Sequence, residues 1–144
     1  MQELRVRRLH SAAALPVRAH DDDAGYDLCA IDGATLAPGE RAMVRTGIAI
    51  ELAAGHAGLV LPRSGLAARH GIALVNAPGL IDAGYRGELK VLLLNTDREA
   101  TFEIHAGDRI AQLVVVAVAT PEVVEAGALA ATARGEGGFG SSGA

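Results

Sequence analysis

Three side chains of different chemistry lie close together in the chain: an acid, Asp82, an aromatic, Tyr85, and a cation, Arg86. They belong to a segment rich in Asn, Pro and Gly, residues 76–87, which predicts a turn. The apolar run that follows, residues 89–94, predicts a buried strand. Alternate residues of a tight hairpin point to opposite faces. An acid and an aromatic three positions apart can therefore line two walls of one pocket, unless the segment is an ordinary hairpin with polar side chains on its surface.

A second group of candidate residues has the chemistry of an anion site. Arg63, Ser64 and Gly65 precede an apolar segment that ends at Gly71, and together they predict a helix of about two turns. A guanidinium, a hydroxyl and free N–H groups at a helix start suit phosphate; the alternative is that Ser64 simply caps the helix. Gln112 begins an otherwise apolar strand, so its amide bonds either to backbone or to a ligand.

Carboxylates cluster near the N-terminal end of the chain. Asp21, Asp22 and Asp23 form a charge run, for which we expect a solvated loop and keep a divalent-cation site as the alternative. Asp27 is different because it lies between Tyr26 and Leu28 in a short strand-like segment. It is therefore the acid in this region that we expect to lie at a site.

Composition excludes several functional classes. The net charge of −4 disfavours a general nucleic-acid binder. The only lysine, Lys90, is not part of a phosphate-binding Gly-Lys-Ser/Thr loop, and the lone Cys29 cannot form an intrachain disulfide. The first ten residues have no signal-peptide apolar region, and the longest apolar run, residues 113–119, is too short to cross a bilayer. We therefore expect a cytoplasmic protein with no nucleic-acid or membrane partner.

The chain length of 144 residues predicts one domain. Its many short strands, separated by Gly and Pro turns, predict an all-β sandwich or jelly roll with one short helix. One long strand is expected over residues 42–52. Because only four residues are aromatic, the core must consist of Val, Leu, Ile and Ala. We expect residues 1–133 to form this β domain.

The C-terminal segments have a different composition. Residues 121–133 predict an irregular, extended arm, and residues 134–144 are rich in Gly and Ser, as in a flexible tail. The tail nevertheless contains Arg134, Phe139 and two hydroxyls, groups that can fold over a phosphate and a base. We expect it to be a flexible lid.

Five segments, in order, resemble the motifs of the trimeric deoxyuridine triphosphate nucleotidohydrolases (dUTPases). They are residues 24–28, 62–67, 76–87, 107–113 and 134–143, and they span nearly the whole chain. Two departures keep the hydroxyl or the charge: Ser142 stands where the family often has Thr, and Arg69 where Lys is frequent. The resemblance implies a dUTPase-like jelly roll that converts dUTP and water to dUMP and pyrophosphate, which keeps uracil out of DNA and supplies dUMP for thymidylate synthesis.

The resemblance also implies a role for each candidate residue. Asp82 would deprotonate the water that attacks the α-phosphorus. Tyr85 would pack on the deoxyribose and exclude a 2′-hydroxyl, and Asn76 would read the uracil edge. Asp27 would hold Mg²⁺ through water. The remaining substrate-binding candidates are Arg63, Ser64, Gly65, Gly79, Lys90, Gln112, Arg134, Phe139, Gly140, Ser141 and Ser142.

In this family each active site draws motifs from three subunits, so the resemblance implies a homotrimer with shared sites. Two other functions remain possible on the same fold. One is a dCTP deaminase, or its bifunctional form that also hydrolyses dUTP, although those enzymes lack this Asp-to-Tyr turn and this Phe-containing tail. The other is a non-catalytic nucleotide-binding regulator.

Overall fold

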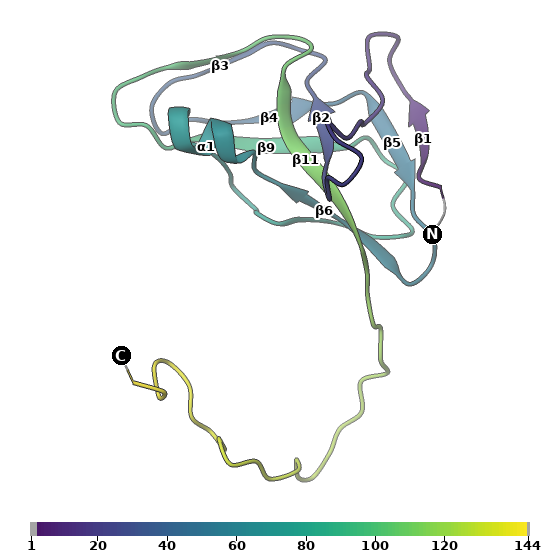
Figure 1. The fold of residues 1–144 in the computed structure, drawn as a ribbon, viewed down its shortest axis with the longest axis vertical. Coiled ribbons are helices and arrows are strands. Elements are labelled where there is room, and N and C mark those ends of the chain that lie inside the picture. Colours follow the sequence, from purple (N-terminus) through teal and green to yellow (C-terminus); the bar gives the residue numbers. More distant parts are fainter. Residues whose placement is uncertain (1–2, 144) are drawn as a thin grey trace.

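The computed structural model describes residues 3–143, in which eleven strands and one short helix are arranged as an all-β body with an extended C-terminal arm (Figure 1). The predicted fold class is confirmed. The strands are β1 (Arg5–Arg8), β2 (Tyr26–Cys29), β3 (Ala34–Leu36), β4 (Arg41–Arg45), β5 (Ile48–Glu51), β6 (His56–Leu61), β7 (Ile72–Leu74), β8 (Gly79–Ile81), β9 (Lys90–Asn95), β10 (Phe102–Ile104) and β11 (Arg109–Ala117), and the helix is α1 (Ser64–His70). Residues 1, 2 and 144, which the predictions for the two ends of the chain include, lie outside the described part.

The strands form four antiparallel sheets. The largest has the order β2-β11-β6-β8, the second β4-β9-β7, and two pairs, β1-β5 and β10-β3, complete the body. Non-consecutive strands are neighbours in every sheet, so segments far apart in the sequence meet at each sheet surface. β11 is central in the largest sheet, where it pairs Gln112 with both Asp27 of β2 and Leu61 of β6.

The core is aliphatic, as the composition predicted. The largest fully buried side chains include Leu28, Leu36, Ile48, Leu93 and Leu113. None of the four aromatic residues is buried: Tyr26 and Phe102 are half-buried, and Tyr85 and Phe139 are exposed. Aliphatic side chains of similar size fill the space between the sheets, which leaves the aromatic side chains available at the surface.

The prediction of one strand over residues 42–52 was wrong. The strand is interrupted between β4 and β5 at Thr46 and Gly47, and Gly47 has a φ of 69°. That left-handed conformation suits glycine and turns the two strands into different sheets. The alternation in the sequence continues across the break, so periodicity alone does not reveal it.

The expected hairpin is present but is not tight. β7 and β9, the strands on either side of residues 76–87, pair antiparallel from Ile72–Asn95 to Leu74–Leu93. The segment between them contains an additional strand, β8, which does not pair with β9. β8 pairs with β6 in the largest sheet, and β9 pairs with β4 and β7 in the second. The Asp82–Tyr85 turn therefore connects two sheets, and the strand predicted over residues 89–94 is β9, Lys90–Asn95.

Helix α1 has the predicted position and the predicted end. Gly71 has a φ of 65° and its N–H bonds to the carbonyl of Ala67, an ordinary glycine cap. The start differs from the prediction because Arg63 is the cap residue, Ser64 is the first helical residue, and no side chain caps the helix. The Ser64 hydroxyl is therefore not committed to capping.

Candidate functional site

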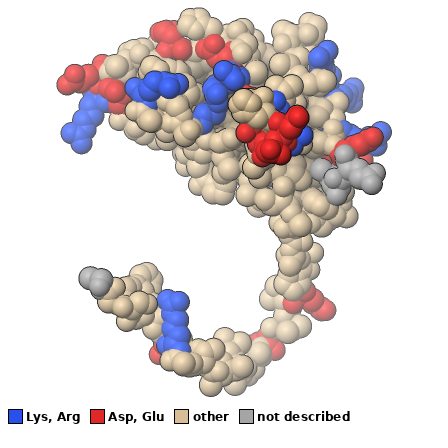
Figure 2. All heavy atoms as spheres, viewed as in Figure 1, with Lys and Arg blue, Asp and Glu red and all other residues tan. Residues whose placement is uncertain are grey.

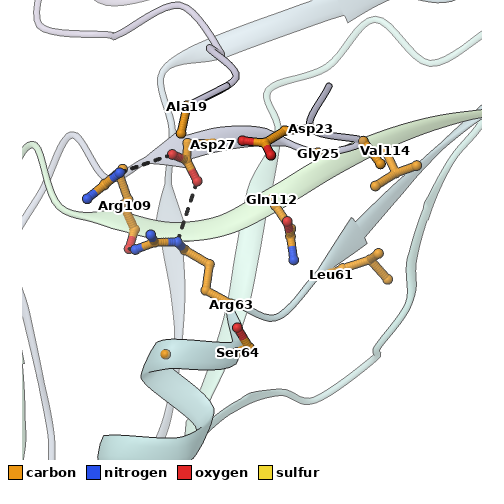
Figure 3. A pocket seen from close by; sticks show the side chains of 12 residues that line it. Ala19, Asp23, Gly25, Asp27, Leu61, Arg63, Ser64, Arg109, Gln112 and Val114 are labelled. Carbon is orange, nitrogen blue, oxygen red and sulfur yellow. Dashed lines mark hydrogen bonds and ion pairs between the residues drawn. The ribbon is translucent and has the colours of Figure 1, made fainter. Parts of the chain in front are cut away.

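The first candidate site is a cavity of about 430 Å³ where β2, β11 and the start of α1 meet (Figure 3). It gathers five of the predicted residues, which lie far apart in the sequence. These are Asp27, Arg63, Ser64, Gly65 and Gln112. The strand register explains this convergence, since Gln112 lies opposite both Asp27 and the residue that ends β6.

Asp27 lies between two guanidinium groups in this cavity. Its Oδ1 is 3.4 Å from Nε of Arg63, and its Oδ2 is 3.3 Å from Nη1 of Arg109. The Asp27 side chain is only 15% exposed, so these ion pairs are shielded more than ordinary surface pairs. Arg63 also donates from Nη1 to the carbonyl of Arg109 at 3.1 Å, which fixes the two arginines relative to each other.

Gln112 bonds to backbone and also lines the cavity. Its Nε2 donates to the carbonyl of Pro62 at 3.0 Å, which connects β11 to the segment before α1. Gly25 allows the amide to lie close to the β2 edge, because a Cβ at that position would be 2.5 Å from Oε1 of Gln112. The amide orientation is therefore determined by its neighbours on both sides.

The second candidate site is a separate cavity of about 410 Å³ around the Asp82–Tyr85 turn, lined also by Lys90. The side chains of Met43, Leu80 and Leu92 give it an apolar wall. This cavity shares no lining residue with the first one. An exposed acid, an exposed aromatic ring and a cation beside an apolar wall suit an organic ligand with a polar edge.

The turn itself is held by its own hydrogen bonds. The Tyr85 N–H donates to the carbonyl of Asp82 at 3.0 Å, and the Tyr85 hydroxyl donates to the carbonyl of Glu88 at 3.0 Å. Nη1 of Arg86 donates to the carbonyl of Ala83 at 2.6 Å. Asp82 and Tyr85 are consequently presented on an ordered backbone.

Asn76 and Gly79 lie at the start of the same segment but line neither cavity. Gly79 is buried against β6, where a Cβ would be 3.3 Å from Cβ of Val60 and 3.5 Å from Nδ2 of Asn76. The exposed Asn76 amide is therefore close to the backbone at the β8 edge. This arrangement can present backbone and amide groups together to one ligand edge.

The tail residues lie apart from both cavities. Residues 118–136 are exposed throughout, and the arm leaves the body after β11 (Figures 1 and 2). Nε of Arg134 donates to the carbonyl of Gly137 at 2.7 Å, and the Phe139 ring is fully exposed with a φ of 47°. Gly140, Ser141 and Ser142 are exposed as well. In one chain the predicted residues therefore form three separate groups.

Arg109 is the functional candidate that sequence reasoning missed. It stands three residues before Gln112 in a segment already singled out, and it begins β11, where it pairs with Cys29. Charged residues at a strand end look like ordinary surface residues in the sequence. Its partner, Asp27, is 82 positions away, and only strand pairing brings the two together.

Cys29 lies next to this charge cluster. Burial raises the pKa of the Cys29 thiol, and the carboxylate of Asp27 raises it further, while Arg109 and Arg63 act in the opposite direction. The folded chain therefore favours the protonated thiol over the thiolate.

Comparisons with known proteins identify the family of this chain. The dUTPase family model matches residues 11–143. A deoxyuridine 5'-triphosphate nucleotidohydrolase of Thermobifida fusca is 57% identical over 138 residues, covering 96% of this chain and 77% of that protein. The protein of the same name from Mycobacterium tuberculosis is 54% identical over 145 residues, covering 97% and 94%.

Solved structures agree in fold. The dUTPase of Staphylococcus bacteriophage 80alpha with dUPNHPP has a TM-score of 0.93 at 32% identity and covers all of both chains. A variant dUTPase of phage phi11 of S. aureus, described with a structural Mg(II) ion, has a TM-score of 0.83 at 30% identity and covers 90% of this chain and 100% of that one. The match in sequence over nearly the whole length, together with the match in fold, shows that this chain belongs to the dUTPase family.

Proposed function

We propose that this chain hydrolyses dUTP to dUMP and pyrophosphate by attack of water at the α-phosphorus. The observation that carries the proposal is its 57% identity, over 96% of its length, to a deoxyuridine 5'-triphosphate nucleotidohydrolase. The chemistry of the two cavities is consistent with that reaction. A deaminase and a non-catalytic regulator have no specific observation in their favour.

The cavity around Asp27 would bind the triphosphate. Arg63 and Arg109 provide two cationic groups at the cavity wall, of which Arg63 is the less exposed. The free Ser64 hydroxyl, the Gly65 backbone and the Gln112 amide add neutral polar groups. Guanidinium groups bind phosphate with paired, charge-assisted hydrogen bonds. They would also stabilise the charge that shifts to the leaving pyrophosphate during transfer.

The same cavity fits Mg²⁺ in one particular way. Within residues 3–143, no group of three or more His, Cys, Asp or Glu side chains could hold a metal ion. Mg²⁺ commonly keeps several waters and is bound by one or two carboxylates together with substrate phosphates. Asp27 would supply that one carboxylate, through water, and the ion would offset phosphate charge when bound.

The Asp82–Tyr85 turn would bind the nucleoside and the attacking water. Asp82 would orient and deprotonate the water, which requires hydrogen-bond distance in the substrate complex. Tyr85 would pack against the deoxyribose and leave no room for a 2′-hydroxyl. Asn76 with the Gly79 backbone would read the uracil edge, where thymine's methyl group would clash. Lys90 would supply a cation at the same cavity.

A homotrimer with shared sites forms part of the proposal. The triphosphate cavity, the Asp82–Tyr85 turn and the tail are three separate groups in one chain. Subunits related by a threefold axis would combine the groups from different copies. The tail, with Arg134 on phosphate, Phe139 on uracil, and Gly140, Ser141 and Ser142 along the nucleotide, would close over the site as a lid.

The cellular site of action is also part of the proposal: the chain would act in the cytoplasm, where nucleotide pools are maintained. None of the helices in residues 3–143 has the length and apolarity required to span a membrane.

Pyrophosphate release from separate solutions of dUTP, dCTP, dTTP and UTP tests the proposed function. We expect release from dUTP, with the other three nucleotides close to background. Deamination of dCTP would favour the deaminase, and binding of dUTP without pyrophosphate release would favour the regulator. Either result would overturn the proposal.

A further inference from the structure

The residues between β4 and β5 form hydrogen bonds with Glu88 and Leu89, which follow the Asp82–Tyr85 turn. The Glu88 carboxylate, only 14% exposed, accepts a hydrogen bond from the Gly47 N–H at 2.9 Å. It also accepts from Nε of Arg45 at 3.2 Å. A shielded carboxylate that accepts from a backbone N–H and a guanidinium forms a strong, directional contact.

The residue next to Glu88 reinforces the same junction. The carbonyl of Leu89 accepts from the Thr46 N–H at 3.2 Å and from the Thr46 hydroxyl at 2.5 Å. The Leu89 N–H donates to the carbonyl of Ile48 at 2.8 Å. Both Leu89 and Thr46 are 1% exposed, so this junction lies in the core. Residues 88 and 89 are thus held in place by hydrogen bonds to residues 45–48, where β4 ends and β5 begins.

A short path of contacts connects this junction to the proposed catalytic turn. The Tyr85 hydroxyl donates to the Glu88 carbonyl, and the Tyr85 N–H donates to the Asp82 carbonyl, both at 3.0 Å. The ring also lies against Gly87, where a Cβ would collide with it. The position of Glu88 therefore determines where the Tyr85 ring and the Asp82 backbone lie.

We propose that Glu88 is a positioning residue for the Asp82–Tyr85 turn and helps to determine the preference for deoxyribonucleotides. Glu88 also lines the second cavity, but its carboxylate is engaged by the Gly47 N–H and by Arg45. It helps to hold the backbone to which the Tyr85 hydroxyl is bonded, so loss of its carboxylate would loosen the support of the ring that is proposed to face the sugar. A displacement of about 1 Å at such a residue is enough to lower turnover by roughly 10²-fold. This inference rests on the proposed function.

The test compares three variants of the full chain. Glu88→Ala removes every hydrogen bond of the carboxylate. Glu88→Gln retains an oxygen that accepts from the Gly47 N–H. Glu51→Ala is the matched control, because Glu51 forms an exposed ion pair with Arg5 at 3.4 Å on another pair of strands. The readouts are kcat and KM for dUTP and for UTP, and amide hydrogen exchange of the turn without nucleotide.

For Glu88→Ala we expect kcat/KM on dUTP to fall about tenfold or more, mainly through kcat. We expect the preference for dUTP over UTP to fall as well, and the amide exchange of Gly47 and Tyr85 to accelerate about tenfold. Glu88→Gln should restore most of each property, and Glu51→Ala should leave all of them unchanged. A purely structural role would lower the melting temperature without changing the preference for dUTP over UTP.

The inference is overturned if folded Glu88→Ala keeps both its turnover and its preference for dUTP over UTP within about twofold of the original chain. If Glu88→Ala does not fold, Arg45→Gln serves in its place, since it weakens the junction and leaves the Gly47–Glu88 bond intact. Amide exchange separates the two proposals. Absence of dUTP hydrolysis by the unaltered chain would overturn the proposed function, whereas unchanged exchange of Tyr85 in Glu88→Ala would overturn the positioning role.

Discussion

The Asp27 carboxylate and the Arg109 guanidinium lie 3.3 Å apart across the β2–β11 pair, at the wall of the proposed triphosphate cavity (Figure 3). Arg63 contacts the other oxygen of the same carboxylate at 3.4 Å. The acid proposed for metal binding is therefore paired with two of the cations proposed for phosphate binding. When a triphosphate binds to Arg63 and Arg109, their pairing with Asp27 would weaken, and the Asp27 carboxylate would become available to hold a metal ion through water.

This pairing predicts the behaviour of Arg109→Gln. Binding of a non-hydrolysable dUTP analogue should weaken about tenfold, because a phosphate contact is lost. The Mg²⁺ concentration that gives half-maximal binding should fall, since one of the two guanidinium groups that compete for Asp27 is removed. Calorimetric titration measures both quantities, with Arg5→Gln as the control. Unchanged values for both would show that Arg109 has no role in the site.

Asp82→Asn keeps the side-chain volume and removes the proposed base. Hydrolysis of dUTP should fall at least about 10²-fold, while binding of the non-hydrolysable analogue is retained. Single-turnover assays, with the analogue affinity measured in parallel, test this. Turnover near that of the unaltered chain would remove Asp82 from the base role.

Shared sites predict complementation between inactive chains. We expect a mass of about three times 14.7 kDa in solution by light scattering. Chains carrying Asp82→Asn and chains lacking residues 134–144 should each be inactive alone. After they are mixed and reassembled, some trimers should regain activity, because one chain supplies what another lacks. A monomer that is fully active would contradict the shared-site proposal.

The tail should order only over a bound nucleotide. Fixing its backbone costs about 1–2 kcal/mol per residue, and contacts to phosphate and base would offset that cost. Deletion of residues 134–144 should leave the assembly folded and lower turnover sharply. Phe139→Ala should have a smaller effect, about 1–3 kcal/mol if the ring stacks on uracil. Turnover at saturating dUTP is the measurement, and full activity of the deletion chain would show that the tail is a plain flexible segment.

Cys29 predicts a dependence of stability on alkaline pH. Burial, followed by the Asp27 carboxylate, raises the pKa of its thiol in the folded chain. The folded chain therefore favours the protonated form. The contribution of Cys29 to stability is complete below the pKa of the unfolded thiol and is lost as pH rises through the folded pKa. Urea unfolding from neutral to alkaline pH should show a steeper loss for the unaltered chain than for Cys29→Ala, and parallel losses would contradict the raised pKa.

Local patterns in the sequence were sufficient for several elements of the fold. The aliphatic core, the helix that ends at Gly71 and the short strand around Asp27 follow from composition, a glycine cap and alternation. These features depend on residues within a few positions of one another, so the sequence alone indicates them. The resemblance of the five motifs identified the family for the same reason, since each motif is a continuous segment.

Only the tertiary structure decided which segments meet. Alternation indicates that a segment is a strand but does not identify the strand with which it pairs. The pairing of β8 with β6 was therefore not predictable from the sequence. The break at Gly47 is determined by its φ and by the distant Glu88 carboxylate, both absent from local periodicity. The Asp27–Arg109 pair likewise exists because two strands 82 positions apart pair edge to edge. Long-range pairing is set by the packing of whole sheets, and that packing separates the Asp82–Tyr85 turn from the cavity around Asp27 within one chain.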